Sequence, residues 1–337
     1  MVTLKDIAGK CGLSVATVSK AINNMPDISP VTMARVQQVA REMGYLPNAA
    51  ARSMKTGRSM TVGMLFFLGN NESVWTHSYS SLVADSIHRA IEDSGYDLTP
   101  VSFKGASIMG GYLNYCRYRN YDGIIVMSGG SDEPALQELA DSNFPVVTID
   151  CRMSGKASVT SDNVAGLYRL VHHVHSKGHR RIAFIHGNPS TVTEDRRKGF
   201  LTACKDLQID VPAEYLMEAP YLSREASAAA TETLLDLPNR PSCIIYPDDL
   251  ACLGGIEVIQ RRRLSIPEDI SIVGYDDHPV ASVLNPKLTT YRQDCQAIGA
   301  QAADMLLEAI ANPSSGSPRH LVIPGQLVEG ESVGNLN

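Results

Sequence analysis

The chain has 337 residues, of which 44% are hydrophobic and 20% charged, a composition typical of folded globular proteins rather than disordered or fibrous ones. At roughly 100–200 residues per domain, this length predicts two or three domains. The seven cysteines are scattered and form no C-x-x-C pair, which argues against a disulfide framework, a zinc ribbon and a thioredoxin-type site. The sequence shows no signal peptide and no apolar run long enough for a membrane span, so we expect a cytoplasmic protein without a membrane partner.

The formal charge of −6 is unevenly distributed along the chain. Residues 1–60 contain eight lysines and arginines against three acidic residues, so they carry +5 and the remaining 277 residues carry −11. A small basic head on an acidic body indicates that the head binds a polyanion such as DNA. The alternative is a solvated charge imbalance without a function.

Three short helices are predicted within the first 47 residues. Their capping residues are Thr3, Ser14 and Ser29. A tight turn at Gly12 separates the first helix from the second, which runs from Val15 to about Asn23. The third begins with a proline directly after its cap and ends at Gly44, a residue suited to the left-handed stop after a helix.

Two helices joined by a glycine turn and supported by a third form a helix-turn-helix unit, whose second helix enters the major groove of DNA. The outer face of this second helix carries small or polar residues: Ala16, Thr17, Ser19, Lys20 and Asn23. Small residues let a helix lie close to the bases, and Lys20 can reach a guanine or a phosphate. Any three-helix bundle could show the same helical pattern, so the pattern alone leaves that alternative open.

The segments TLKDIAGKCGLSVATVSKAIN and GYLPNAAARSMKTGRS resemble the head and hinge of the lactose-repressor (LacI/GalR) family. The resemblance implies a helix-turn-helix DNA-binding domain over residues 1–47 and a hinge helix or linker over residues 48–57. It also implies that Val15, Ala16 and Lys20 read bases of a pseudo-palindromic operator. The residues that it places mostly against the DNA backbone are Thr3, Ser14, Thr17, Ser19 and Asn23.

The hinge segment, residues 48–56, has a helical pattern with Asn48 as its cap and with Arg52 and Met54 within it. So short a helix is marginal alone because nucleation is costly, so we expect it to form only on DNA. In the resembling family this helix inserts a leucine into the minor groove, and here Met54 stands in that place. Methionine can also wedge between bases, and the alternative is a linker with an incidental methionine.

From residue 61 the chain alternates apolar strand patterns with longer helical patterns. The predicted strands are Thr61–Phe67, Leu98–Phe103, Gly123–Met127, Val146–Ile149, Arg181–Ile185, Cys243–Tyr246 and Ile270–Gly274. Among the predicted helices are Ser80–Ser94, Pro134–Ser142, Val164–Lys177, Thr193–Leu207, Ser223–Leu237 and Leu250–Arg263. Such alternation predicts doubly wound parallel sheets, and the number of strands predicts two α/β lobes divided near residue 160.

Two facing lobes would enclose a cleft at the carboxyl ends of their strands. The resembling family has such a core, which is similar to periplasmic binding proteins, with crossovers that we place near Ser158–Asp162, Leu288–Gln293 and His320–Gln326. We therefore expect an N-terminal lobe of residues 58–160 and 290–320. Residues 161–289 and 321–337 would form the C-terminal lobe.

Two runs in the body, VTEDRRKGF at 192–200 and SIVGYDD at 271–277, also match the family. They place Arg196 and Asp276 on its ligand-binding arginine and aspartate. Further ligand positions fall on Asp150, Thr193, Tyr221, Asp248 and Gln293. Asp248 stands where the family usually has asparagine. Carboxylates, an arginine and an aromatic ring are suited to a sugar-type ligand, and Trp75 is either the aromatic platform or a lobe-packing residue.

An enzymatic function has little support in the sequence. There is no G-x-S-x-G, no Walker A motif and no G-x-G-x-x-G, so we expect no catalytic residue and no cofactor. His172 and His175 share a helical face, but no acidic or cysteine partner completes a metal site near them. A sugar-binding transport receptor would explain the body but not the basic head, and a carbohydrate-active enzyme would need a catalytic pair of carboxylates.

The sequence thus predicts a ligand-responsive, sequence-specific transcriptional regulator, most simply a repressor of carbohydrate-utilisation genes. A homodimer is expected because two heads are needed on a two-fold operator. Whether the effector releases the protein from DNA or recruits it is left open.

Overall fold

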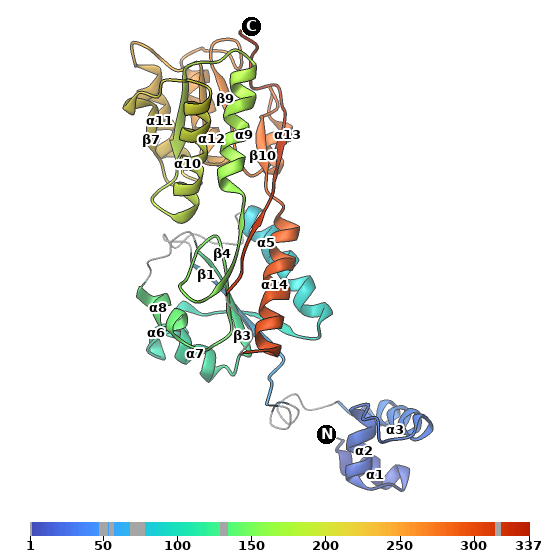
Figure 1. Cartoon of the computed structure of the whole chain (residues 1–337). Coiled ribbons are helices and arrows are strands. Elements are labelled where there is room, and N and C mark those ends of the chain that lie inside the picture. Colours follow the sequence, from blue (N-terminus) through green and yellow to red (C-terminus); the bar gives the residue numbers. More distant parts are fainter. Residues whose placement is uncertain (1, 47–52, 54–56, 68–77, 129–133, 314–317) are drawn as a thin grey trace. The chain divides into compact units, whose positions relative to one another are not determined.

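The computed structural model describes residues 2–46, 53, 57–67, 78–128, 134–313 and 318–337 (Figure 1). The chain divides into two compact units, Met1–Ser59 and Met60–Asn337. Of the helices in these described ranges, none is both long enough and apolar enough to span a membrane.

The first unit is a three-helix head formed by α1 (Leu4–Cys11), α2 (Val15–Ile22) and α3 (Pro30–Glu42). The three helix starts agree with the predicted caps, because each capping side chain accepts a hydrogen bond from the backbone of the first turn. Gly12 and Gly44 adopt the left-handed conformation that ends α1 and follows α3. The small core joins all three helices, and its buried residues are Ile7, Ala8, Cys11, Val18, Ala21, Val36 and Ala40.

The second unit contains two parallel sheets. In the first sheet the strand order is β11-β5-β4-β3-β1-β2. Its strands are β1 (Thr61–Phe67), β2 (Asp97–Pro100), β3 (Gly123–Ser128), β4 (Val146–Ile149), β5 (Ala157–Ser161) and β11 (His320–Ile323). One face is covered by α5 (Ser78–Asp93) and α14 (Cys295–Ala311), and the other by α6 (Phe103–Ile108), α7 (Tyr112–Tyr118) and α8 (Pro134–Asp141).

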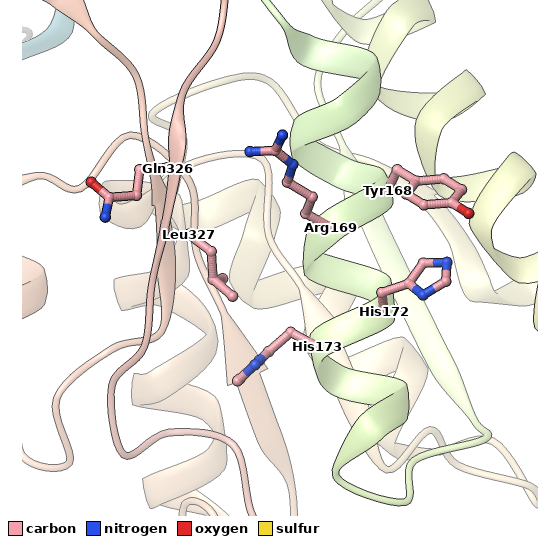
Figure 2. Close-up of a pocket in the computed structure, with 6 residues that line it drawn as sticks. All are labelled: Tyr168, Arg169, His172, His173, Gln326 and Leu327. Carbon is pink, nitrogen blue, oxygen red and sulfur yellow. The ribbon is translucent and has the colours of Figure 1, made fainter.

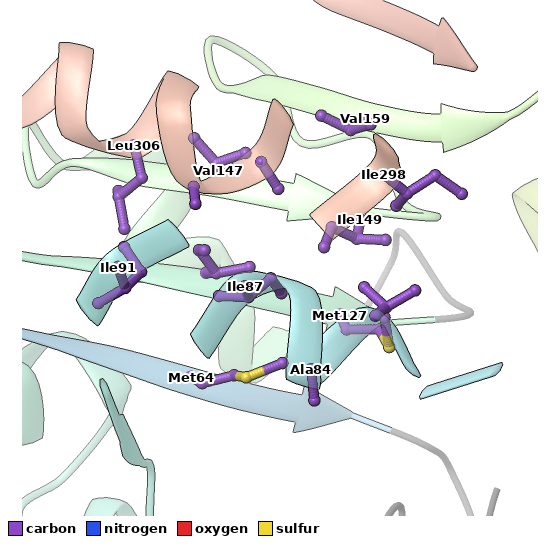
Figure 3. Packing of buried hydrophobic residues seen from close by; sticks show 14 of the residues in the cluster. Met64, Ala84, Ile87, Ile91, Met127, Val147, Ile149, Val159, Ile298 and Leu306 are labelled. Carbon is purple, nitrogen blue, oxygen red and sulfur yellow. The ribbon is translucent and has the colours of Figure 1, made fainter. Parts of the chain in front are cut away.

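The core between the first sheet and its two long helices is built mainly from apolar side chains. Figure 3 shows side chains of α5 and α14, among them Ile87 and Ile298, packed over Val147 and Ile149 of β4. Alternate strand residues such as Ile124 and Val126 face the opposite layer, so both faces of the sheet are buried. This double burial explains the continuous apolar runs of the sequence.

The second sheet has the order β7-β6-β8-β9. Its strands are β6 (Ile182–His186), β7 (Leu216–Glu218), β8 (Cys243–Ile245) and β9 (Ser271–Val273). The helices on its two faces are α9 (Asn163–Ser176) with α10 (Thr191–Asp206) and α11 (Arg224–Leu235) with α12 (Asp249–Arg261). A 3-10 turn η2 (Ala213–Tyr215) and a short helix α13 (Pro279–Val283) complete this lobe. The two doubly wound sheets confirm the predicted fold class.

The lobes are joined where the chain leaves β5, β10 (Thr290–Arg292) and β11. β10 pairs antiparallel with β12 (Gln326–Val328), so two of these connections run side by side. β11 pairs with β5 as far as Ile323, so residues 321–323 belong to the first sheet, whereas the sequence predicted the lobe boundary after residue 320. The boundary differs because a parallel edge strand continues through it.

One further prediction in the first lobe was wrong in detail. The strand predicted over Leu98–Phe103 ends at Pro100, because Ser102 caps α6 and Phe103 begins that helix. Helices α6 and α7 have no counterpart among the predicted elements. Gly105 lowers the helix propensity of α6, but it leaves the space in which the Tyr115 ring of α7 packs.

Candidate functional site

The predicted reading helix, α2, presents its small residues to solvent. Val15 is 45% exposed, and Ala16 and Lys20 are also exposed, while Val18 and Ala21 of the same helix are buried in the head core. Thr17 and Ser19 are half-buried. The exposed face therefore has few bulky side chains to hold it away from a DNA groove.

The residues predicted to hold the DNA backbone lie mainly at the helix ends and form local hydrogen bonds. The Thr3 hydroxyl donates to Asp6 Oδ2 at 2.7 Å, and Ser14 Oγ accepts from the Thr17 backbone N–H at 3.0 Å. Asn23 Nδ2 donates to the carbonyl oxygen of Ser19 at 2.6 Å. Because Thr3 and Ser14 cap two helix N-termini, they stand where helix dipoles favour a phosphate.

Lys20 has an intramolecular partner that the sequence analysis missed. Its ammonium donates to Asp27 Oδ2 at 2.5 Å, and both side chains are about half-exposed. Asp27 lies seven residues away in the loop between α2 and α3, where helical periodicity does not apply. The hydrogen bond from Lys20 lowers the pKa of Asp27, so the carboxylate stays ionised beside the candidate DNA contact.

Four predicted site residues lie outside the described part of the chain: Asn48, Arg52, Met54 and Trp75. Their predicted roles in the hinge and as an aromatic platform stay predictions.

In the second unit, Arg196 of α10 is the centre of a group of polar residues from both lobes. It is only 4% exposed. Its Nε donates to Asn163 Oδ1 at 2.9 Å, and a terminal nitrogen donates to the Pro247 carbonyl oxygen at 2.8 Å. The guanidinium carbon lies 3.6 Å from the centre of the Tyr275 ring, a cation–π contact. These contacts hold the guanidinium in one orientation.

The remaining terminal nitrogen of Arg196 faces Asp276, with 3.8 Å between the nitrogen and Oδ1. Gln293, at the crossover after β10, donates to the same Asp276 oxygen at 2.6 Å. Asp276 has a backbone φ of 100°, a conformation that non-glycine residues rarely adopt, and its backbone N–H donates to the Tyr291 carbonyl. The two residues placed by the family motifs are therefore neighbours, although 80 positions separate them.

The first lobe contributes Asp150 from the end of β4. The Tyr79 hydroxyl donates to its Oδ2 at 2.5 Å, and the Thr160 hydroxyl donates to its Oδ1 at 3.2 Å. Burial raises the pKa of Asp150, although the hydrogen bond from Tyr79 and the charge of Arg196 act in the opposite direction. We call Asp150, Arg196, Asp276 and Gln293, with Tyr79 as the further member missed by the sequence analysis, the interlobe cluster.

Tyr221 and Thr193 support the cluster from the second lobe. Their hydroxyl groups are 2.8 Å apart, and the Tyr221 ring centre lies 5.5 Å from the guanidinium carbon of Arg196. The ring rests on the backbone of Gly187, where a Cβ atom would come within 2.1 Å of it. A glycine is therefore needed at this position for Tyr221 to reach the arginine.

Asp248 differs from the other predicted residues because both of its oxygens bind backbone groups. Oδ1 accepts from the N–H of Ala251, capping α12, and Oδ2 accepts from the N–H of Leu222, each at 2.8 Å. An asparagine has a single side-chain oxygen, so an aspartate is required for this double role. Burial, followed by the nearby charge of Asp276, raises the pKa of Asp248 to about 6.

Two hollows lie beside the segments that connect the lobes. The larger, of about 950 Å³, reaches Asp276 and Gln293 and extends between α5 and the start of α14. The other, of about 500 Å³, lies between α9 and β12 and contains no predicted site residue (Figure 2). Figure 2 also shows that His172 and His173 point to different sides of α9. Within the described ranges, no three His, Cys, Asp or Glu side chains gather as metal ligands.

Comparison with known proteins agrees with this two-part architecture. Residues 3–48 match the family model described as bacterial regulatory proteins, lacI family, and residues 171–333 match a periplasmic binding protein-like domain. The HTH-type transcriptional repressor PurR of Edwardsiella ictaluri is 31% identical over 99% of this chain and 97% of its own length. The chain belongs to the LacI family.

Solved structures of LacI-family regulators share the fold. The Lac repressor dimer bound to operator and the anti-inducer ONPF has a TM-score of 0.82 and 24% identity, covering 99% of each chain. A LacI-family regulator from Enterococcus faecium with bound ribose has a TM-score of 0.69 and 26% identity, covering 82% of this chain and all of that chain. Membership of the LacI family confirms the predictions of a DNA-binding regulator and of a protein that is not an enzyme.

Proposed function

We propose that this protein is an effector-controlled repressor that binds pseudo-palindromic operator DNA as a homodimer and senses a sugar-type ligand at the interlobe cluster. One observation carries the proposal: a single chain combines an exposed, small-residue face on α2 with a charged cluster shared by two lobes. The Lac repressor dimer bound to operator and the ribose-bound Enterococcus faecium regulator are similar proteins with such ligands. Since a bacterial operator lies in the cytoplasm, the proposal places the protein there.

On the DNA side, the proposal gives α2 the reading role. Val15, Ala16 and Lys20 would approach base edges, because their face is exposed and, apart from Lys20, short. The backbone contacts would come from Thr3, Ser14, Thr17, Ser19 and Asn23. The proposed hinge, residues 48–57, would add Asn48, Arg52 and Met54 once it folds on DNA, with Met54 in the minor groove.

On the effector side, the proposed ligand contacts are Trp75, Asp150, Thr193, Arg196, Tyr221, Asp248, Asp276 and Gln293. Asp248 would act mainly by holding the backbone at Leu222 and the start of α12, because its oxygens are already occupied there. The proposed lobes are residues 58–160 with 290–320 and residues 161–289 with 321–337, except that β11 extends the first lobe to Ile323.

The control mechanism follows from the position of the cluster on both lobes. Asp150 belongs to the first lobe and Arg196 to the second, and Arg152 of the first lobe also lies 3.8 Å from Asp195 of the second. A ligand that binds both lobes favours one arrangement of the lobes over another. It changes operator affinity only as far as its affinities for those two arrangements differ.

The proposal is tested with an operator selected from genomic fragments and with fluorescence anisotropy in the presence of increasing sugar concentrations. Lys20→Ala is expected to weaken specific operator binding but to keep sugar binding measured by calorimetry. Asp276→Ala is expected to bind the operator normally without sugar and to lose the response to it. The sugar binding kept by Lys20→Ala and the operator binding kept by Asp276→Ala show that each variant is folded. The proposal is wrong if Asp276→Ala responds to the sugar with an unchanged midpoint or if no genomic fragment is enriched.

A further inference from the structure

The charges of the interlobe cluster do not balance. Arg196 carries one positive charge, against the carboxylates of Asp150, Asp276 and the adjoining Asp248. Two other arginines nearby are already paired, since Arg152 lies 3.8 Å from Asp195 and Arg292 donates to Asp277 at 2.6 Å. Among the residues that the structure describes, the group therefore carries an excess of negative charge.

The cluster keeps unused N–H donors of Arg196 beside an acceptor oxygen of Asp276. One N–H of Arg196 donates to Asn163 and another to Pro247, and the remaining terminal nitrogen faces Asp276 at 3.8 Å. Gln293 occupies Oδ1 of Asp276, and among the described residues no hydrogen bond reaches its Oδ2. Two adjacent hydroxyl groups of a neutral sugar satisfy such a pair, because one accepts from the arginine while the other donates to the carboxylate.

We infer that the interlobe cluster binds a neutral polyhydroxylated ligand and rejects the same compound once it carries a phosphate or a carboxylate. An anionic group that accepted from Arg196 would lie beside Asp276, with Asp150 on the opposite lobe. At an effective dielectric constant of about 20, repulsion by two uncompensated carboxylates weakens binding by about tenfold or more. This inference rests on the proposed function, since it takes the effector to bind at this cluster.

The protonation behaviour of the surrounding residues agrees with an excess of negative charge. Burial raises the pKa of both Asp150 and Asp248, and the charge of Asp276 adds to the rise in each case. Burial and the charge of Asp150 also raise the pKa of Tyr79, which keeps its hydroxyl protonated as a donor. A further negative charge would have to overcome the same repulsion.

The test compares matched compounds by isothermal calorimetry with the full chain: galactose, galacturonate and galactose 6-phosphate, the corresponding glucose series, and ribose with ribose 5-phosphate. We expect binding of a neutral member, with its acid and phosphate ester at least about tenfold weaker. An acid or phosphate ester that binds as tightly as its neutral parent overturns the inference. Operator binding without sugar is measured separately. If the protein binds no operator, that result counts against the proposed function and not against this inference.

Inorganic phosphate and sulfate provide a probe that does not depend on the identity of the sugar. We expect neither anion to raise the thermal unfolding midpoint of the wild type more than that of Arg196→Met. Stabilisation by phosphate that Arg196→Met abolishes overturns the inference, because it reveals an anion site at the guanidinium.

A charge-removing variant tests the cause of the selectivity. Asp150→Asn removes one negative charge, while its amide still offers a partner to the hydroxyls of Tyr79 and Thr160, which can donate or accept. We expect the ratio of neutral to anionic affinity to fall severalfold. Asp304→Asn removes the same charge from an exposed position on α14 and is expected to leave the ratio unchanged. Equal ratios in both variants and the wild type overturn the electrostatic explanation.

Discussion

Replacing Arg196 by methionine is expected to lower the free energy of unfolding of the second unit by about 3–5 kcal/mol, the usual cost of removing one partner of a buried charged pair. Methionine keeps an unbranched apolar chain at this 4%-exposed position but no donor. The hydrogen bonds to Asn163 and Pro247 are lost, each worth about 1.5–3 kcal/mol when the donor is charged. Asp276 is left without its cation. The loss of these hydrogen bonds is already part of the total cost of removing the arginine, so the two energies are not added.

Urea unfolding followed by circular dichroism measures this loss. Arg197→Met is the matched control, because Arg197 is the next residue of the same helix and is exposed. The double variant Arg196→Met/Asp276→Asn is expected to recover part of the stability, since it also removes the carboxylate that lost its partner. A loss below about 1 kcal/mol for Arg196→Met, or one equal to that of Arg197→Met, refutes the view that the buried guanidinium holds the cluster together.

Three further outcomes are expected. Lys20→Ala weakens specific operator binding by about 1–3 kcal/mol in anisotropy titrations. An equal loss on random DNA would show that Lys20 contacts only a phosphate. Asp27→Asn frees the lysine from its ion pair and tightens operator binding. The pKa of Asp248 is raised to about 6 in the folded protein, from an ordinary value of 3.8. Between these two values the folded state keeps a proton that the unfolded state releases. The contribution of Asp248 to the free energy of unfolding therefore falls by roughly 3 kcal/mol between about pH 4 and pH 6. A pH-independent stability difference between wild type and Asp248→Asn contradicts this. Gly187→Ala displaces the Tyr221 ring and costs about 1–3 kcal/mol in urea unfolding, which an unchanged midpoint disproves.

The fold could be predicted wherever local pattern and burial agree. The head was predicted to within about two residues at its helix ends, because Ser14, Ser29 and Gly44 act through hydrogen bonds and backbone conformations that involve only their neighbours. The strands β1, β3 and β4 were equally clear, since a strand buried on both faces must be apolar throughout. Helices α6 and α7 were missed, and the glycine within α6, Gly105, is explained only by the Tyr115 ring of α7 that packs against it.

The candidate site, too, could be predicted from the sequence only in part. The sequence by itself determined which residues were candidates, since Arg196 and Asp276 stand within runs that match the family. Only the tertiary structure decided their partners. Tyr79 reaches Asp150 across 71 positions, and Asp248 binds the backbone at Leu222 across 26. No sequence periodicity encodes such pairs, because a hydrogen bond between distant segments depends on how the sheet and helices of each lobe bring those segments together.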